Sequence, residues 1–156
     1  MTIAHLSTTL SAAETEVFGG RFALELHGGD VVLLEAELAA GKTTLVKGLV
    51  AGLHGDPTDV SSPTFVLIQS YSCTSGDITT LHHVDLYRLG ERVTDLREIG
   101  IEDMLSDPRA VTAVEWPKEA IATWIPPDAR VWRIGIAVEE DDARTITITP
   151  PNGLNF

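Results

Sequence analysis

The sequence has little cysteine and no long apolar run, and each shortage excludes a class of protein. Cys73 is the one cysteine among 156 residues, so no disulfide can form within the chain. No apolar run approaches the roughly 18–20 residues that span a bilayer. The first residues carry neither the basic nor the apolar region of a secretory signal. We therefore expect a cytoplasmic protein in which residues 1–156 form a single domain.

Basic residues are also scarce. The chain has 11 Lys and Arg against 23 Asp and Glu, which gives a formal net charge of −12. Binding to a nucleic acid through its phosphates needs clustered Lys and Arg, whereas the basic residues here are scattered. The composition therefore argues against strong direct binding of tRNA or DNA. We expect any nucleic-acid substrate to be held by a partner protein.

Helical and strand patterns are mixed along the whole chain, which predicts an α/β fold. A capping box, Ser11-Ala-Ala-Glu14, opens an apolar-periodic stretch that predicts a helix to about Leu26. Possible hairpins imply that part of the sheet is antiparallel. The other predicted strands are 31–34, 65–71, 79–86, 110–114, 131–138 and 145–149, with turns at 72–77 and 139–142, and the other predicted helices are 42–53, 93–99 and 101–105.

Residues 36–43, Ala-Glu-Leu-Ala-Ala-Gly-Lys-Thr, fit the phosphate-binding P-loop pattern with Ala at the first position. A buried strand precedes them and a helix follows, which is the context that the pattern requires. The loop is expected to direct backbone N–H groups at phosphate oxygens, and the helix dipole adds positive potential there. Lys42 supplies a charge for the β- and γ-phosphates, and the Thr43 hydroxyl is a hard oxygen ligand for Mg²⁺. The predicted nucleotide-binding residues here are Leu38, Ala39, Ala40, Gly41, Lys42, Thr43 and Thr44.

Two alanines in this loop, Ala36 and Ala39, stand where glycine is common. If either position requires a positive φ, alanine costs on the order of 1 kcal/mol relative to glycine. We expect nucleotide binding to survive these alanines. A lower dissociation constant in Ala39→Gly would support strain in the loop.

Carboxylates and hydroxyls at strand ends complete the candidate site. Glu115 ends an apolar strand, which suits the acidic residue that holds Mg²⁺ in P-loop proteins. His83 and Asp85 share a strand face. Because no further ligands follow at usual zinc spacing, we favour Asp85 as a carboxylate that positions Mg²⁺ or water. Thr64, in a switch-like Ser-Pro-Thr-Phe loop, is placed to sense the metal and γ-phosphate. Trp116 follows Glu115 and either closes over the site or belongs to the core, and the sequence pattern alone favours the core.

Three functions fit these residues. The guanine-reading Asn-Lys-x-Asp string and the Asp-x-x-Gly string of GTPases do not occur in the sequence, so we favour ATP as the nucleotide. An ATPase is the first interpretation. A small-molecule kinase is the second, with residues 87–97 as an arginine-bearing lid. A nucleotide-sensing module without catalysis is the third.

Five strings occur in an order that resembles one family. They are Ala-Gly-Lys-Thr-Thr at 40–44, Ser-Pro-Thr-Phe at 62–65, His-Val-Asp-Leu-Tyr-Arg-Leu at 83–89, Glu-Ile-Gly-Ile-Glu-Asp at 98–103 and Val-Glu-Trp-Pro at 114–117. Together they resemble the TsaE (YjeE) family, over roughly residues 10–149. The family usually reads Gly-Asp-Leu-Gly-Ala-Gly-Lys-Thr in its loop, so two of its glycines are replaced by alanine here.

The resemblance implies a P-loop NTPase-like α/β domain with a mixed central sheet flanked by helices. It implies a bacterial ATPase that uses ATP and Mg²⁺, turns over slowly alone, and supports the TsaD–TsaB pair. That pair installs the threonylcarbamoyl group on the adenosine beside the anticodon, adenosine 37 of tRNA. The tRNA is then reached through the partners, which agrees with the acidic composition of this chain.

The resemblance also implies roles for individual residues. Lys42 binds phosphate, and Thr43 and Glu115 are the metal residues. Asp85 matches a carboxylate needed for activity, and Thr64 matches the switch-like loop. Further residues that the resemblance assigns to the nucleotide are Trp116, Ser11, Thr15 and Arg144.

Overall fold

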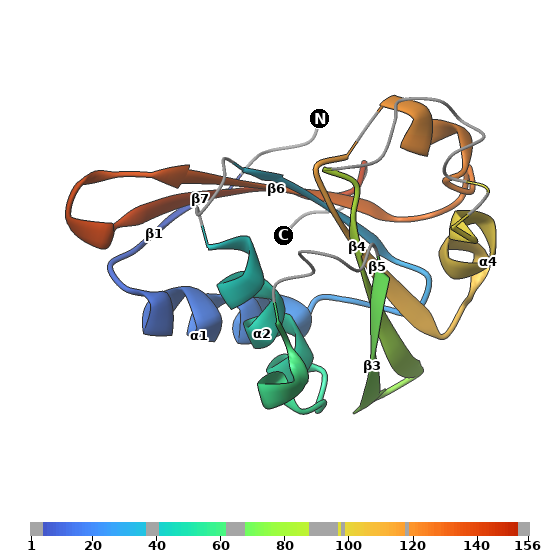
Figure 1. The fold of residues 1–156 in the computed structure, drawn as a ribbon, viewed down its shortest axis with the longest axis horizontal. Coiled ribbons are helices and arrows are strands. Elements are labelled where there is room, and N and C mark those ends of the chain that lie inside the picture. The colour runs from blue at the N-terminus through green and yellow to red at the C-terminus, as the bar shows by residue number, and fades with distance from the viewer. Residues whose placement is uncertain are drawn as a thin grey trace.

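The computed structural model describes residues 5–36, 41–61, 68–87, 97, 99–117 and 119–152. Seven strands form one sheet in the order β1-β7-β6-β2-β5-β4-β3 (Figure 1). Their bounds are β1 (His5–Thr9), β2 (Val31–Ala36), β3 (Ile68–Ser75), β4 (Ile78–Asp85), β5 (Ala110–Glu115), β6 (Val131–Val138) and β7 (Arg144–Thr149). The helices are α1 (Ala12–Ala23), α2 (Lys42–Gly52) and α4 (Ile101–Ser106), with 3₁₀ turns η1 (Pro57–Asp59), η2 (Glu119–Thr123) and η3 (Glu140–Asp142).

The centre of the sheet is parallel and its margins are antiparallel. Strand β2 pairs in parallel with β5 and β6, and β5 pairs in parallel with β4. Strands β3, β7 and β1 each join an antiparallel partner. The carboxyl ends of β2, β5 and β4 therefore meet at one edge. Ligands of open α/β sheets bind at such an edge.

Helices α1 and α2 lie side by side on one face of the sheet (Figure 1). Glycine makes this close packing possible, since a Cβ on Gly48 would stand 2.1 Å from the backbone oxygen of Glu16. A Cβ on Gly19 would stand 2.6 Å from the backbone oxygen of Leu45. Farther along both helices a Cβ on Gly52 would stand 2.7 Å from the Cβ of Ala23, whereas Gly19 approaches Leu45, so the two helices run in the same direction. Their amino termini therefore lie near each other, beside the carboxyl end of β2.

The opposite face of the sheet carries a second apolar core. Ile101 and Leu105 of α4 and Ile121 of η2 pack there with apolar residues of the parallel strands. Helical segments thus cover both faces, and the predicted mixed α/β fold is confirmed. No helix in the described part of the chain is long and apolar enough to cross a membrane.

Most elements follow the predicted pattern, with two corrections. Strand β3 continues to Ser75, so the hairpin turn is Gly76-Asp77 and the prediction of a turn over 72–77 was too long. Gly76, at a φ of +58°, makes the tight reversal possible. Strand β1 was not predicted. The predicted helix 93–99 lies almost wholly outside the described residues, as do positions 65–67 of the predicted strand.

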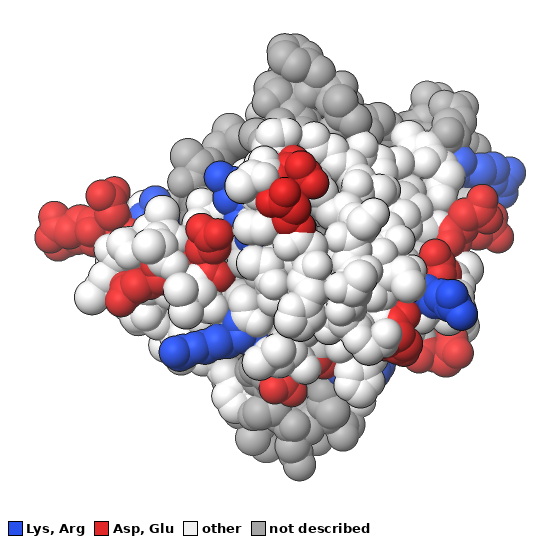
Figure 2. Space-filling view, turned by 90° about the horizontal axis from the view of Figure 1, so that it is seen from below, with Lys and Arg blue, Asp and Glu red and all other residues white. Residues whose placement is uncertain are grey.

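Acidic and basic side chains are interspersed on the face of the sheet that carries α1 and α2 (Figure 2). Figure 2 shows that the described Lys and Arg side chains of this face lie around its rim, with Asp and Glu between them. They form no continuous basic surface on the described part of that face.

Candidate functional site

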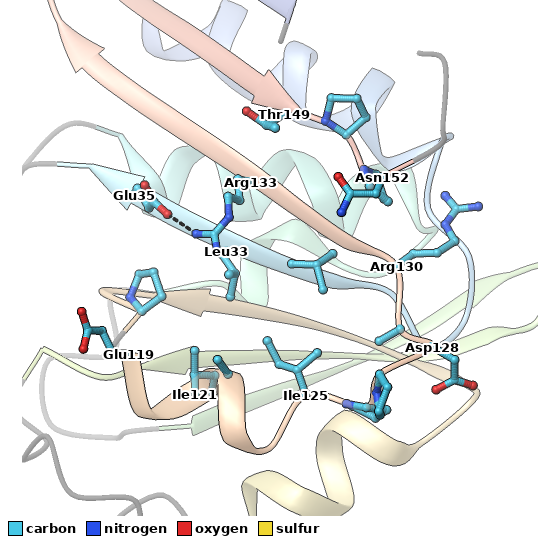
Figure 3. Close-up of a pocket in the computed structure, with 18 residues that line it drawn as sticks. Leu33, Glu35, Glu119, Ile121, Ile125, Asp128, Arg130, Arg133, Thr149 and Asn152 are labelled. Atoms are coloured by element: carbon cyan, nitrogen blue, oxygen red, sulfur yellow. Dashed lines mark hydrogen bonds and ion pairs between the residues drawn. The ribbon is translucent and has the colours of Figure 1, made fainter. Parts of the chain in front are cut away.

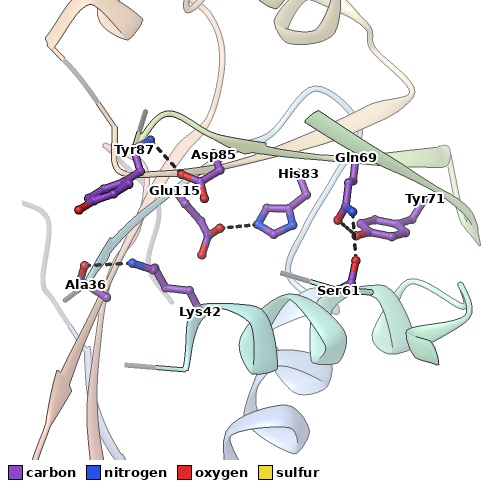
Figure 4. Close-up of polar contacts among 9 residues, drawn as sticks. All are labelled: Ala36, Lys42, Ser61, Gln69, Tyr71, His83, Asp85, Tyr87 and Glu115. Atoms are coloured by element: carbon purple, nitrogen blue, oxygen red, sulfur yellow. Dashed lines mark hydrogen bonds and ion pairs between the residues drawn. The ribbon is translucent and has the colours of Figure 1, made fainter. Parts of the chain in front are cut away.

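Lys42 is the first residue of α2 and is almost fully buried, with 7 % of its surface exposed. Gly41 precedes it at a φ of +103°, a left-handed conformation that suits glycine. The Lys42 ammonium donates to the Ala36 carbonyl at 3.2 Å (Figure 4). It also lies 3.9 Å from the centre of the Trp116 ring. Burial lowers the pKa of Lys42, and the negative charges of Glu115 and Asp85 oppose that shift.

Glu115 and Asp85 end two neighbouring parallel strands and are register partners. Glu115 is 3 % exposed, and its Oε2 lies 2.9 Å from His83 Nε2. Asp85 Oδ1 accepts a hydrogen bond from the Tyr87 backbone at 2.9 Å. Burial raises the pKa of Asp85, and nearby Glu115 raises it further, against the lowering effects of that hydrogen bond, His83 and Lys42. The sheet therefore brings together the predicted lysine and both predicted carboxylates.

Trp116 covers this cluster because of an unusual backbone conformation. Its φ is +55°, in the left-handed region that costs a non-glycine residue about 1–2 kcal/mol. The indole packs on the Tyr87 ring with centroids 5.0 Å apart, and it forms the cation–π contact with Lys42. The structure thus places Trp116 at the site. Strain of this kind is typical of functional positions.

A cavity of about 410 Å³ opens beside the amino terminus of α2. Ser11 and Thr15 from the start of α1 line it, together with Arg144 at the start of β7. The structure therefore brings together five residues that were predicted separately as nucleotide contacts. The full lining is Leu10, Ser11, Ala12, Thr15, Gly41, Thr44, Asp141, Asp142 and Arg144.

The hydroxyls of two of these residues already have partners in the protein. Ser11 Oγ caps α1 by accepting from the Glu14 backbone at 3.1 Å. Thr15 Oγ1 donates to the Ser11 carbonyl at 3.2 Å and lies 2.7 Å from Thr9 Oγ1. Their first role is to fix the start of α1 against β1. They shape the wall of the cavity through that role.

A larger cavity, about 780 Å³, lies between η2, β2, β6 and the residues after β7 (Figure 3). Its floor includes Leu33, which belongs to the core beneath α4. The Arg133–Glu35 ion pair, 2.7 Å long and half exposed, lies at its wall. None of the residues predicted for the site lines this cavity. Size alone therefore does not mark the functional site here.

Comparison with known proteins shows which family this chain belongs to. The family model described as "Threonylcarbamoyl adenosine biosynthesis protein TsaE" matches residues 9–146. The chain belongs to the TsaE family. Proteins named "tRNA threonylcarbamoyladenosine biosynthesis protein TsaE" are 39 % identical in Streptomyces coelicolor, over 84 % of this chain and 86 % of that protein, and 37 % identical in Treponema pallidum, over 88 % and 95 %.

A solved structure supports the fold of this TsaE family member. The crystal structure of YdiB from Bacillus subtilis aligns with a TM-score of 0.68 and 30 % sequence identity. The alignment covers 97 % of this chain and 88 % of that one. The mixed sheet and its helices are therefore a known family architecture.

The donor set at the carboxyl edge fits Mg²⁺. Thr43, in the first turn of α2, offers a hydroxyl, and Glu115 and Asp85 offer carboxylates. Mg²⁺ takes oxygen ligands and usually keeps waters and substrate phosphates beside one or two carboxylates. No group of three or more His, Cys, Asp or Glu suited to a metal occurs in the described residues. The site thus fits a cation shared with phosphates better than an all-protein zinc site.

Several predicted residues cannot be compared with the structure. Thr64, Leu38, Ala39 and Ala40 lie outside the described residues. Ala36 is described as the last residue of β2, an extended conformation, so the strain considered for a positive φ does not arise there. The corresponding question for Ala39 stays a prediction.

The structure also shows site residues that sequence reasoning missed. Asp141 and Asp142 line the smaller cavity in consecutive left-handed conformations, with φ of 55° and 63°. Tyr87 supports Trp116, and His83 holds Glu115. The position of His83 two residues before Asp85 was the available signal. The others depend on contacts between distant segments.

Proposed function

We propose that this chain is a Mg²⁺-dependent ATPase that acts in tRNA threonylcarbamoyladenosine biosynthesis. The observation that carries the proposal is the convergence of Lys42, Glu115 and Asp85 at the amino terminus of α2, in a member of the TsaE family. A buried lysine beside two carboxylates and a helix amino terminus is suited to a phosphate-bound metal.

The nucleotide lies across the start of α2 in this proposal. Lys42 points to Glu115 and Trp116, whereas Gly41 and Thr44 line the smaller cavity. The phosphates therefore bind at the helix terminus with the γ-phosphate on the carboxylate side. The base and ribose occupy the cavity, whose volume of about 410 Å³ suits a small ligand.

Hydrolysis then follows from the groups on the carboxylate side. A water attacks the γ-phosphorus, the bond to the β-phosphate oxygen breaks, and ADP and inorganic phosphate result. Lys42 stabilises the negative charge that develops on the departing oxygen. Asp85, whose pKa is raised by burial, orients the water and takes its proton. Thr43 and Glu115 hold Mg²⁺, which neutralises phosphate charge when bound.

The tRNA is reached through partner proteins in this proposal. The chain has a net charge of −12, which opposes binding to a phosphate backbone. The TsaD–TsaB pair that the family resemblance implies is the proposed partner, and ATP hydrolysis supports its turnover. A slow rate for the isolated chain, raised by TsaD–TsaB, is the expected behaviour.

The first test is a calorimetric titration with ATP, ADP and GTP in Mg²⁺, comparing the parent with Lys42→Ala. We expect the parent to bind adenine nucleotides and Lys42→Ala to bind at least about 100-fold more weakly, which is about 2.7 kcal/mol. Lys47→Ala, on the same helix, is the matched control and keeps parental affinity.

Three results would contradict the ATPase. Parental hydrolysis in Lys42→Ala would show that the activity does not use this site. Transfer of phosphate to a metabolite, without any effect of partner proteins, would select a small-molecule kinase. Nucleotide binding without any ATP hydrolysis, alone or with TsaD–TsaB, would select a nucleotide-sensing role without catalysis.

A further inference from the structure

His83 is a buried polar side chain that the proposed hydrolysis does not use. It is 0 % exposed, and its Nε2 lies 2.9 Å from Glu115 Oε2 (Figure 4). An ionised carboxylate only accepts hydrogen bonds, so the imidazole carries a hydrogen on Nε2 and donates it. The ring therefore has a defined task at one of its two nitrogens.

The other ring nitrogen shows that this task is not general support of the core. Nδ1 is buried and has no hydrogen-bond partner among the residues that the structure describes. A buried polar group without a partner costs about 1–3 kcal/mol. An apolar side chain of similar size would avoid that cost. The contact that can offset this cost is the one that the side chain does make, the hydrogen bond with Glu115.

Strand geometry shows what this contact changes. The register partner of Glu115 on β4 is Asp85, and His83 stands opposite Ala113. Glu115 nevertheless leans diagonally back to His83, since two adjacent carboxylates repel each other and an N–H attracts. The hydrogen bond thus draws Glu115 away from Asp85. Each carboxylate is then free for a different role.

We propose that His83 is a positioning residue that holds Glu115 Oε2, so that Oε1 faces the Mg²⁺ of the bound nucleotide. This inference rests on the proposed function. Glu115 has no other side-chain hydrogen bond among the described residues, so its second oxygen remains available to a ligand. Carboxylates that bind metals are usually held by such an outer hydrogen bond, and its loss typically costs 10–100-fold in metal affinity.

The test compares two substitutions that differ in where they place an amide N–H. His83→Gln carries its amide nitrogen at about the distance of Nε2, so it restores the bond to Glu115. His83→Asn is one carbon shorter and places its nitrogen near the position of Nδ1. His82→Gln is the matched control, because His82 is next on the same strand and contacts Ser70 at 2.8 Å.

The measurement is binding of a non-hydrolysable ATP analogue at increasing Mg²⁺ concentrations, with a second titration in excess EDTA. We expect the Mg²⁺ concentration for half-maximal binding to rise about 10-fold or more in His83→Asn. His83→Gln and His82→Gln stay close to the parent. Metal-free binding is the same in all four proteins, because the phosphate loop is untouched.

The outcomes separate this inference from the function on which it rests. A parental Mg²⁺ dependence in His83→Asn overturns the role of His83 and leaves the ATPase standing. An equal loss in His83→Gln and His83→Asn also overturns it, since a requirement for the imidazole shape is then shown. A parent that binds no nucleotide overturns both proposals.

A measurement on the parent covers the case in which His83→Asn does not fold. In protein labelled with ¹⁵N in histidine, the Nε2–H resonance of His83 is expected to shift when Mg²⁺ is added to the complex with the ATP analogue. The resonances of His82 serve as the internal reference. If the His83 resonance does not shift when Mg²⁺ is added, the proposal is overturned without any substitution.

Discussion

Asp30 and Glu115 are both buried, at 2 % and 3 % exposure, but they lie at opposite ends of the parallel strands. Asp30 precedes β2, whereas Glu115 is the last residue of β5. Asp30 accepts from the His27 backbone at 3.0 Å, from Trp132 Nε1 at 3.1 Å, and lies 3.1 Å from Arg130 Nε. Among the described side chains, Glu115 has one such partner, His83.

Asp30 uses its carboxylate to stabilise the fold, whereas Glu115 keeps a carboxylate oxygen that can bind a ligand. Burial has the larger effect on the pKa of Asp30 and raises it on balance, whereas three partners stabilise the charge and lower the pKa. Those partners join the turn before β2 to β6, at the end of the strands opposite to Glu115. Glu115 keeps unused acceptor capacity beside Lys42. An under-satisfied buried carboxylate at the carboxyl edge is therefore the stronger indication of function.

The largest expected effect comes from Glu115→Gln. Glutamine keeps the shape and can still accept from His83, but it lacks the charge that Mg²⁺ requires. We expect phosphate release from ATP to fall about 100-fold, about 2.7 kcal/mol in activation free energy. The free energy of unfolding should change by less than about 1 kcal/mol. Urea unfolding without nucleotide measures the change in stability, to be compared with the change in the rate of phosphate release.

A rate within threefold of the parent in Glu115→Gln would place the metal elsewhere. A large loss of stability with an equally large loss of rate would make Glu115 a structural residue like Asp30. Either result would remove the contrast between the two ends of the sheet.

Asp30→Ala is expected to show the reverse pattern. It leaves the buried Trp132 N–H and the His27 N–H without their acceptor, which costs about 2 kcal/mol in the free energy of unfolding. Nucleotide binding at low temperature, where the protein stays folded, should match the parent. Urea unfolding measures the loss of stability, and a nucleotide titration measures whether the affinity is unchanged.

Glu35→Ala serves as the control for loss of a carboxylate. Its ion pair with Arg133 is about half exposed, so we expect a change below about 0.5 kcal/mol. An equal cost for Asp30→Ala and Glu35→Ala would show that burial and the three donors at Asp30 do not strengthen its contribution.

Local sequence pattern predicted the residues at the carboxyl edge of the sheet better than it predicted Asp30 at the opposite end. The string from Val31 to Thr44 contains the strand, the loop and the helix start within one local segment, so its pattern could be read directly. Glu115 and Asp85 were found because each ends an apolar strand. Their adjacency needed the parallel pairing of β4 with β5, which a single sequence does not encode locally.

Residues that depend on distant partners were not predicted. Asp30 lies in an ordinary-looking turn, and its importance comes from Trp132 and Arg130, about a hundred residues away in sequence. Strand β1 has only five residues and pairs with β7 from the other end of the chain. The hairpin turn was predicted too long because Ser72 and Ser75 have turn-like composition but pair with Thr80 and Ile78 of β4.

Asp85→Asn, with a smaller expected effect than Glu115→Gln or Asp30→Ala, tests whether the ionised Asp85 destabilises the folded protein. Burial and Glu115 raise the pKa of Asp85 in the folded protein, so ionising it costs the folded state more than the unfolded one. Below its ordinary pKa of 3.8 the carboxyl is protonated in both states, and parent and variant should be about equally stable. As pH rises through the raised pKa, the parent loses stability and Asp85→Asn does not.

At pH 7 the variant should be more stable by less than about 1 kcal/mol, because Asp85 is partly exposed and solvent screens its charge. Urea unfolding from pH 3.5 to 8 measures this gap. A gap that does not change with pH, or a parent that is the more stable protein at pH 7, would mean that the fold stabilises the charge of Asp85.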